Sequence, residues 1–488
     1  MSPSATAPAD AKQQAPAPPR NGLDRFFRIS ERGSSISREV RGGLATFFAM
    51  AYIIVLNPII LGSGEDKFHH HLDNAQLVTA TALMAGLTTL LMGVIGNVPI
   101  ALAAGLGINA VVSLQLAPKM SWPDAMGMVV LAGLVLMLLV ASGLRQRVMD
   151  AIPGGLRRAI AIGIGLFIAL IGLVDSGFVT RNPDKANTTV PMGLGIEGKL
   201  QGWPVLIFVA GLALTFVLVV RKTRGAILLG MVTMTVVAVV INAVADIPGG
   251  SWGLTTPELP DKVVATPDFG LIGQVSLFGG FHEVGILTGC LFVFTVLLSG
   301  FFDAMGTIIG VGEEAGLTDK RGQLPGMGRI LMVDGVAVAG GGFGSASANT
   351  CFVESTAGVG EGARTGFANV VTGGLFLLAL VFTPLAEVVP SQAATPALVV
   401  VGFLIMAANV KEIDWSDFTI AVPAFLAMIS MPFTYSITNG IGLGVLSYLL
   451  LRIATRRMRE VPWLLSAVGL CFLVYFLLHP IQQALGSG

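Results

Sequence analysis

Charged residues are scarce in this sequence. Only 12% of its 488 residues are Asp, Glu, Lys or Arg, which is about half the fraction found in soluble globular domains. The formal net charge is zero, and this argues against nucleic acid as a partner, because proteins that bind nucleic acid carry basic patches. The three cysteines, Cys290, Cys351 and Cys471, are far apart. Their spacing suits neither a zinc site nor a disulfide framework, so we expect small core residues and no metal site.

Long apolar runs take the place of the missing charge. Hydrophobic residues form 53% of the chain, and its mean hydropathy is +0.79. Runs of about 20 apolar residues, the length that crosses a bilayer as a helix, recur along the sequence. They predict an all-α polytopic protein embedded in the lipid bilayer. Residues 1–30 precede these runs and begin with an Ala-, Pro- and Gln-rich stretch that lacks the apolar core of a signal peptide, so we expect a disordered cytoplasmic N-terminus.

Fourteen membrane spans are expected, seven on each side of a polar gap at 247–285. A further apolar stretch, 463–479, follows a basic loop and forms either a fifteenth segment or a re-entrant one. The expected spans are 44–62, 77–95, 99–116, 124–142, 158–174, 203–221, 225–246, 287–311, 327–345, 351–361, 366–387, 395–410, 417–433 and 436–453.

The basic residues predict the orientation of these spans. Lys and Arg collect on the cytoplasmic side of membrane proteins. If the N-terminus is inside, the inside segments hold most of the Lys and Arg of the chain, and the outside loops hold few. We therefore expect a multi-pass protein of the plasma (inner) membrane with a cytoplasmic N-terminus. The inside segments are then 20–41, 145–158, 221–224, 320–329 and 452–459.

Two of the expected spans are short and interrupted by glycine. Residues 99–113 read "PIALAAGLGINAVVS", and residues 349–366 read "NTCFVESTAGVGEGARTG". Each belongs to the third span of its half, and a matching pair of broken spans is typical of inverted-repeat transporters. The first spans of the two halves also resemble each other, with "FFAMAYII" at 47–54 and "FFDAMGTII" at 301–309. These patterns predict an internal duplication.

Two acidic side chains within the spans are candidate ligand or proton sites. A carboxylate at mid-bilayer costs about 2.5–3.5 kcal/mol on insertion scales, which makes Asp303 and Glu354 conspicuous. The alternatives are a protonated interior Asp and a Glu that caps its own half-helix. Asn109, in the first broken span, could support the same ligand or form a helix–helix hydrogen bond. Asp334 is expected to pair with Arg329 near the inner membrane edge.

Other polar motifs point to no cofactor. His69, His70 and His71 follow one another in the first outside loop; such a cluster suits a metal site or a solvated loop, and we expect the solvated loop. The glycine-rich stretches "GVGEG" and "GGGFGSAS" lack the Lys-Ser/Thr ending and the strand–helix context of a phosphate loop. We therefore expect no bound nucleotide.

Several longer motifs carry a family resemblance. They are "TFFAMAYIIVLNPIIL" (46–61), "PIALAAGLGINA" (99–110), "FDAMGTIIGVGEEAGLTDKRGQLP" (302–325), "FVESTAGVGEGARTG" (352–366) and "MPFTYSITNGI" (431–441). Over residues of about 30 to 460, the chain resembles the nucleobase-cation symporter-2 (nucleobase:ascorbate transporter) superfamily, and within it the AzgA-like guanine/hypoxanthine permease branch.

The resemblance implies a fold of fourteen spans in two inverted repeats of seven. A core (transport) domain would comprise 44–142 and 287–388, and a gate domain would comprise 158–246 and 395–453. The stretch 463–479 would be an additional C-terminal hydrophobic segment. Short strands would precede the half-helices of spans 3 and 10, and the nucleobase would bind between these half-helices.

The resemblance also assigns substrate-binding residues. Asp303 occupies the position of the acidic residue of span 8 that hydrogen-bonds the base. Glu354 occupies the base-binding acid position of span 10 and is followed by Ser355. Asn109 matches the polar residue that AzgA-like members carry in span 3.

Phe302 and Thr307 complete the expected substrate site, because both belong to the motif around Asp303. Asp303 and Glu354 are the expected proton-coupling residues. The chain departs from the family pattern at two places. Thr307 stands where uracil and xanthine relatives carry a second titratable group, and Gly300 stands where many AzgA-like proteins carry an additional Asp.

The implied function is proton-coupled import of a purine nucleobase (hypoxanthine or guanine, with adenine also accepted) by alternating access. The co-transported proton is the one accessory species expected. The apolar surface of the gate domain suits a homodimer. Four alternatives remain: a xanthine/uracil-type nucleobase permease; a small-anion transporter of the same fold, which two acids at the site disfavour; a channel, for which no repeated pore motif is present; and a membrane enzyme, for which the spans hold no nucleophile–base pair.

Overall fold

The computed structural model of the protein describes residues 21–143, 152–181, 192–196, 198–245, 247–252, 255–260, 262–318, 324 and 326–484. The side chains of residues 249, 250, 302, 303, 306 and 478–484 lie outside this description.

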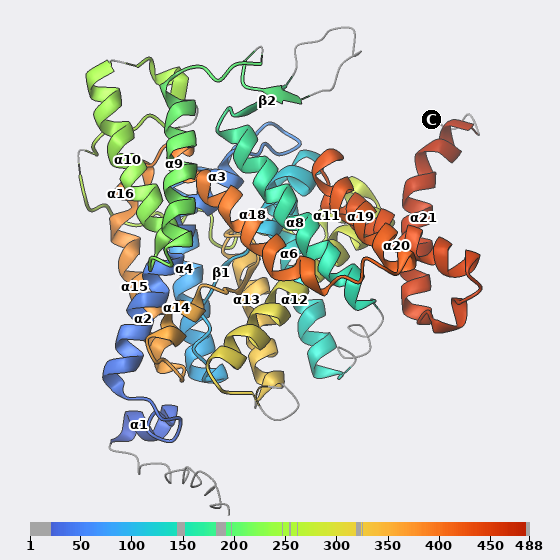
Figure 1. Ribbon diagram of the computed structural model, residues 1–488, viewed down its shortest axis with the longest axis horizontal. Coiled ribbons are helices and arrows are strands. Elements are labelled where there is room, and N and C mark those ends of the chain that lie inside the picture. Colours follow the sequence, from blue (N-terminus) through green and yellow to red (C-terminus); the bar gives the residue numbers. More distant parts are fainter. Residues whose placement is uncertain are drawn as a thin grey trace, which may run out of the picture.

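The described chain is mostly helical (Figure 1). Within it, nine helical stretches are long and apolar enough to cross a membrane. Three shorter apolar stretches, 286–301, 418–433 and 463–477, add to them. The nine long stretches are Ile36–Gly62, Asn74–Gly96, Trp122–Ala141, Gly154–Asp175, Trp203–Val220, Ala226–Ala245, Phe367–Glu387, Ser391–Glu412 and Ile437–Ala454.

The helices form two groups whose members pack mainly on one another, and one continuous hydrophobic core runs through both. The first group consists of α2 (Ile36–Met50), α3 (Ile53–Gly62), α4 (Asn74–Leu91), α6 (Trp122–Ala141), α12 (Ile286–Glu314), α13 (Met327–Phe343), α14 (Ser355–Gly360) and α15 (Phe367–Ala379). The second group consists of α8 (Gly154–Asp175), α9 (Trp203–Val220), α10 (Ala226–Ala245), α18 (Pro396–Asn409), α19 (Phe418–Phe433) and α20 (Ile437–Ala454).

The last helix, α21 (Trp463–Ala484), packs against α20 and α12. It lies at the opposite end of the molecule from α9 and α10 (Figure 1). The helix begins where the additional hydrophobic segment was predicted, and it runs a few residues further. Residues 463–479 therefore form a continuous helix and not a re-entrant turn.

The shorter elements lie between the long helices along the chain. They are η1 (Met92–Gly96), η2 (Val112–Leu116), η3 (Ala117–Lys119), η4 (Gly249–Trp252), α11 (Gly279–Val284), η5 (Leu380–Phe382), α16 (Thr383–Glu387), α17 (Ser391–Ala394), η6 (Val410–Glu412) and η7 (Met458–Glu460). A small hairpin pairs β2 (Val179–Arg181) with β3 (Met192–Leu194).

The first predicted span is a broken helix. The prediction placed one helix at 44–62, whereas α2 begins at Ile36 and ends at Met50, and α3 follows after a two-residue turn. The earlier start has a local cause, because the Ser35 side chain accepts a hydrogen bond from the N–H of Arg38 and caps the helix. The break brings Tyr52 to the junction of α2 and α3.

The prediction that residues 1–30 are disordered is wrong for its last part. Residues 1–20 lie outside the described chain, but α1 (Gly22–Phe27) is a helix whose first turn is capped by Asn21. Phe27 and Ile29 are buried, and the Phe27 ring packs on that of Phe367. Burial of these apolar side chains offsets the entropy cost of ordering a polar segment.

The two glycine-interrupted stretches form a short buried ladder at the centre of the first group. β1 (Leu102–Ala104) pairs antiparallel with β4 (Asn349–Cys351), with Ala103 opposite Thr350. Each strand is followed by a short helix, α5 (Leu106–Val111) after β1 and α14 after β4. The expectation of a short strand before each of these short helices is therefore confirmed.

Glycine lets these short helices approach their neighbours. A Cβ atom at Gly358 of α14 would lie 2.5 Å from the backbone oxygen of Gly42 in α2, and a Cβ at Gly107 of α5 would lie 2.6 Å from Ile164 Cγ2 in α8. Both distances are shorter than atoms tolerate. The glycines that weaken the helix signal in the sequence therefore permit close packing of α5 and α14.

Candidate functional site

Glu354 stands at the point where the chain leaves β4 and enters α14. It is the N-cap residue of α14, and its side chain is half-buried. The phenol of Tyr52, which is itself 1% exposed, donates a hydrogen bond to Oε1 of Glu354. A carboxylate that accepts a hydrogen bond from a neutral donor and remains partly accessible can still accept further hydrogen bonds from a ligand.

Asn109 lies on α5, the short helix that follows the opposite strand of the ladder. Its side chain is fully buried. Neither Oδ1 nor Nδ2 has a hydrogen-bond partner among the residues that the structure describes. A buried polar group left unpaired costs about 1–3 kcal/mol. The amide can therefore gain a donor and an acceptor from a bound molecule, which is the chemistry that the sequence suggested.

The motif around Asp303 lies on α12, which packs against both α5 and α14. The side chains of Phe302 and Asp303 fall outside the described part of the chain, so their predicted roles stay predictions. Thr307 is buried on the same helix. A Cβ atom at Gly300 would lie 3.1 Å from Ile108 Cδ1, which places this turn of α12 directly beside α5.

Ser355 is near Glu354 but is already engaged. Its fully buried hydroxyl oxygen accepts a hydrogen bond from the backbone N–H of Ala101 at 3.0 Å. This bond ties the start of α14 to the residue before β1. The contact in the structure is thus with the backbone, while the substrate contact implied by the resemblance stays a prediction.

Val353 was not singled out in the sequence, yet it stands beside Glu354 with a 57% exposed side chain. It follows Phe352, which is buried. Val353 is thus an accessible apolar side chain next in sequence to the Glu354 carboxylate. An isolated valine in an apolar stretch carries no sequence signal for this position.

Tyr52 was also missed, and here a signal was present. When residues 47–54 are aligned with 301–309, Tyr52 matches Thr307, which the resemblance placed in the site.

Asp334 was expected to pair with Arg329 near the inner membrane edge, but its carboxylate contacts β4 instead. It is fully buried, and its Oδ1 accepts from Thr350 Oγ1 at 3.5 Å and from Cys351 Sγ at 3.6 Å, both in β4.

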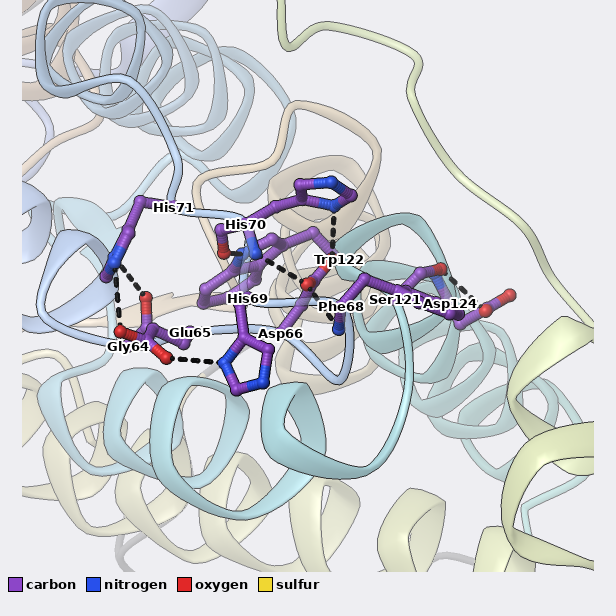
Figure 2. Close-up of polar contacts among 10 residues, drawn as sticks. All are labelled: Gly64, Glu65, Asp66, Phe68, His69, His70, His71, Ser121, Trp122 and Asp124. Carbon is purple, nitrogen blue, oxygen red and sulfur yellow. Dashed lines mark hydrogen bonds and ion pairs between the residues drawn. The ribbon is translucent and has the colours of Figure 1, made fainter.

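The histidine loop, residues 64–71, forms a second polar cluster between α3 and α4 (Figure 2). Glu65 lies between two rings, with Oε2 at 3.0 Å from His69 Nδ1 and Oε1 at 3.1 Å from His71 Nε2. Both rings are largely exposed. Within the described residues, no group of three or more His, Cys, Asp or Glu side chains is arranged to hold a metal ion.

Asp66 anchors this loop. Its Oδ1 accepts from the N–H of Phe68 at 2.8 Å and of His70 at 2.9 Å (Figure 2). Trp122 Nε1 of α6 donates to the backbone oxygen of His70 at 2.9 Å. Burial opposes the charge of Asp66, but these N–H donors and the His70 ring together hold the pKa of Asp66 below its usual range.

A polar contact joins η2, which follows α5 in the chain, to the start of α20 in the second helix group. Gln115 of η2 accepts hydrogen bonds through Oε1 from Ser436 Oγ at 3.2 Å and Thr438 Oγ1 at 3.1 Å. Thr438 Oγ1 also lies 3.2 Å from Thr295 Oγ1 of α12. Gln115, Thr295 and Thr438 are buried and Ser436 is partly buried, so this polar contact lies inside the packed protein between α12 and α20.

Comparison with known proteins identifies the architecture. Residues 37–443 match the sequence model of a permease family. The chain belongs to this family, the nucleobase:ascorbate transporter family. It is therefore a multi-pass membrane transport protein and not an enzyme.

Its relatives include named permeases. The guanine/hypoxanthine permease PbuG of Bacillus subtilis is 37% identical over 460 residues, which cover 93% of this chain and 99% of PbuG. The adenine permease AdeQ of Escherichia coli is 35% identical over 458 residues, with 93% and 96% covered. The guanine/hypoxanthine permease PbuO of Bacillus subtilis is 34% identical over 455 residues, with 92% and 99% covered.

Solved structures share the fold at low sequence identity. The transmembrane domain of the cyanobacterial bicarbonate transporter BicA superposes with a TM-score of 0.57 at 15% identity, covering 84% of this chain and 97% of that domain. SLC26A9 superposes with a TM-score of 0.60 at 15% identity, covering 86% of this chain and 66% of SLC26A9. At this identity the likeness concerns the fold alone.

Proposed function

We propose that this protein is a proton-coupled symporter that imports purine nucleobases, hypoxanthine or guanine and also adenine, by alternating access. The observation that carries the proposal is the pair of polar groups beside the central ladder that can form further hydrogen bonds. The half-buried Glu354 carboxylate and the unpartnered amide of Asn109 follow opposite strands of the same two-stranded ladder. Relatives of similar length are named as guanine/hypoxanthine and adenine permeases.

The chemistry of a purine suits these groups. A purine ring presents N–H donors beside carbonyl or ring-nitrogen acceptors on its edge, and its two faces are apolar. Glu354 accepts from the N–H groups, the Asn109 amide both donates and accepts, and Val353 contacts a ring face. A small anion offers acceptors alone and would be repelled by Glu354, so the shared fold with anion transporters does not favour anion transport here.

Asp303 and Glu354 are the proposed proton carriers, and Phe302, Thr307 and Ser355 complete the proposed substrate site. A carboxylate within the membrane that is neutralised by a proton or by a bound base changes its charge during transport. Inward movement of one positive charge at about −100 mV contributes roughly 2.3 kcal/mol, which supports about fortyfold accumulation.

The proposed architecture is fourteen spans in two inverted repeats, in the plasma (inner) membrane with the N-terminus in the cytoplasm. The first helix group corresponds to the proposed core domain and the second to the gate domain. Movement of one group against the other would break the contact of Gln115 with Ser436 and Thr438 on one side of the ladder. Apolar side chains exposed on α9 and α10, among them Leu206, Val236 and Val240, suit a homodimer contact.

Uptake by reconstituted protein tests the proposal. Proteoliposomes with an inward proton gradient should accumulate radiolabelled hypoxanthine or guanine, and a protonophore should abolish the accumulation while facilitated equilibration continues. A competition panel of hypoxanthine, guanine, adenine, xanthine and uracil ranks the substrates and separates the xanthine/uracil alternative. Purine uptake that ignores the proton gradient contradicts symport, and uptake of bicarbonate or sulfate without purine contradicts the substrate class.

Two substitutions test the proposed proton carriers in the same assay. Glu354→Gln should abolish most uptake while the purified protein remains folded, because the amide no longer offers two acceptor oxygens. Asp303→Asn should weaken the dependence of uptake on the proton gradient. Normal uptake by Glu354→Gln removes Glu354 from the site, and unchanged pH dependence in Asp303→Asn removes Asp303 from coupling.

A further inference from the structure

Tyr52 meets Glu354 from a different span of the first helix group. It lies in the turn between α2 and α3, and its side chain is almost fully enclosed. Its hydroxyl group donates to Glu354 Oε1. α14, which Glu354 caps, packs along α2. The turn between α2 and α3 therefore holds a phenol that donates directly to the proposed substrate-binding acid.

Hydrogen bonding separates the role of Tyr52 from that of Asn109. The Tyr52 side chain is 1% exposed and its hydroxyl group already donates to Glu354 Oε1, whereas the buried Asn109 amide has no partner among the described residues. A Glu side chain has three rotatable bonds, and an unrestrained one loses conformational freedom when it binds a ligand. A charge-assisted hydrogen bond to one oxygen holds the carboxylate in one rotamer before the ligand arrives and fixes the direction of the second oxygen.

The similarity between the first spans of the two halves argues that the contact between Tyr52 and Glu354 has a role in the site. Tyr52 matches Thr307 when the first spans of the two halves are aligned. Thr307 is likewise buried, on α12, the helix that packs against α5 and its Asn109. Each half thus has a buried side chain with a hydroxyl group at the equivalent point of its first span. The first span of each half also packs on the short helix of the other half, α2 on α14 and α12 on α5.

We propose that Tyr52 is a positioning residue that orients the Glu354 carboxylate to accept N–H groups of the nucleobase. This inference rests on the proposed function, because it assigns Tyr52 to the same site. Tyr52 makes no contact with the base itself. Its loss should therefore weaken ground-state recognition of the substrate and leave the movement of the loaded carrier intact.

The test is Tyr52→Phe, which removes the hydroxyl group and keeps the ring. Initial rates of hypoxanthine uptake in proteoliposomes should show a KM about tenfold or more above that of wild type, because the variant loses a hydrogen bond to a charged group. The Vmax should stay within about twofold of wild type.

Tyr448→Phe is the matched control, because Tyr448 is also buried but lies on α20 beside Arg452. Its KM should not change. An unchanged KM in Tyr52→Phe overturns the proposal, as does a fall in Vmax alone.

Infrared spectroscopy gives a readout that does not depend on transport. The difference spectrum between wild type and Glu354→Gln isolates the carboxyl band of Glu354, and Tyr52→Phe should shift that band while Tyr448→Phe leaves it in place. The reciprocal measurement needs no Tyr52 variant: with ring-labelled tyrosine, Glu354→Gln should shift the phenol C–O band of one tyrosine. If the wild type transports no nucleobase, the proposed function fails, and these bands still decide whether Tyr52 orients Glu354. Unshifted bands in both measurements overturn the contact.

Discussion

Ser355 Oγ accepts a hydrogen bond from the backbone N–H of Ala101 at 3.0 Å, and both groups are fully buried. The bond joins the first residue of α14 to the residue that precedes β1, so it adds a side-chain contact to the backbone pairing of β1 with β4. The adjacent ladder bonds run from Phe352 N–H to the oxygen of Ala101 and from Gly105 N–H to the oxygen of Ala348. The positions of Glu354 and Asn109 depend on this frame.

Removal of the Ser355 hydroxyl should destabilise this frame. In Ser355→Ala, the Ala101 N–H loses its acceptor in a buried site, which costs about 1–3 kcal/mol. Thermal unfolding of the purified protein should report the loss, and the control Ser142→Ala, at the exposed end of α6, should unfold like wild type. If Ser355→Ala keeps its stability but its KM for hypoxanthine rises about tenfold, Ser355 binds the substrate directly.

Asn109→Leu separates a ligand-binding amide from a structural one. The substitution replaces two unpartnered polar atoms by methyl groups of similar volume, so the free energy of unfolding should stay equal or rise. The KM for nucleobase uptake should rise about tenfold or more, because the base loses its amide partners.

Asn369→Leu is the matched control for this experiment. The Asn369 amide donates to the backbone oxygens of Val98 at 3.0 Å and Ile100 at 2.7 Å. Its replacement leaves two buried carbonyl groups without a donor and should cost about 2 kcal/mol or more. The ligand role is excluded if Asn109→Leu destabilises the protein as strongly as Asn369→Leu does and leaves the KM unchanged.

The broken spans were predictable because their cause is local. Glycines and polar residues interrupt two apolar stretches at corresponding places, and both stretches form a strand and a short helix. The three-residue strands themselves left no periodic signal, because every residue of β1 and β4 is buried and no alternation results. They followed from the family resemblance alone.

The contact of Tyr52 with Glu354 was not predictable, because the two residues lie far apart in the chain. Residues 46–61 read as one largely apolar helix, and the hydroxyl group of Tyr52 does not indicate its partner. Its partner Glu354 is 302 positions away. For the same reason, the helix at 22–27 was missed: its stabilisation comes from contacts of Phe27 and Ile29 with distant residues, whereas composition describes the segment alone.

Docking of the histidine loop should depend on pH through Asp66. The pKa of Asp66 is lower in the folded protein than in the unfolded chain. Its ionised form therefore stabilises the docked loop above about pH 4, and this contribution is lost as the pH falls through the folded-state pKa. Hydrogen exchange of residues 64–72, corrected for intrinsic rates, should show constant protection between about pH 8 and 5 and a loss below about pH 4.

Asp66→Asn tests the origin of that protection. The variant keeps one acceptor oxygen but lacks the charge, so protection should fall by about 1 kcal/mol at neutral pH and vary less on acidification. Glu65→Gln is the control, because Glu65 is exposed and contacts only the rings of His69 and His71 among the described polar contacts. If Glu65→Gln loses as much protection as Asp66→Asn, the effect comes from the net charge of the loop and not from the hydrogen bonds of Asp66.

An ion pair between Arg224 and Glu361 connects the loop of the second helix group with the end of α14 in the first. The Arg224 side chain is 78% exposed, so the pair should add only about 0–1 kcal/mol to folding stability. Its position between the groups gives it a larger expected effect on transport. Arg224→Glu and Glu361→Arg should each change the uptake rate severalfold through like-charge repulsion, and the double reversal should return the rate toward wild type. The effect should shrink in high salt, where exposed charges are screened.

Arg221→Glu, in the same loop, is the control for a change of charge alone. If Arg221→Glu changes the uptake rate as much as Arg224→Glu does, the ion pair itself does not set the rate.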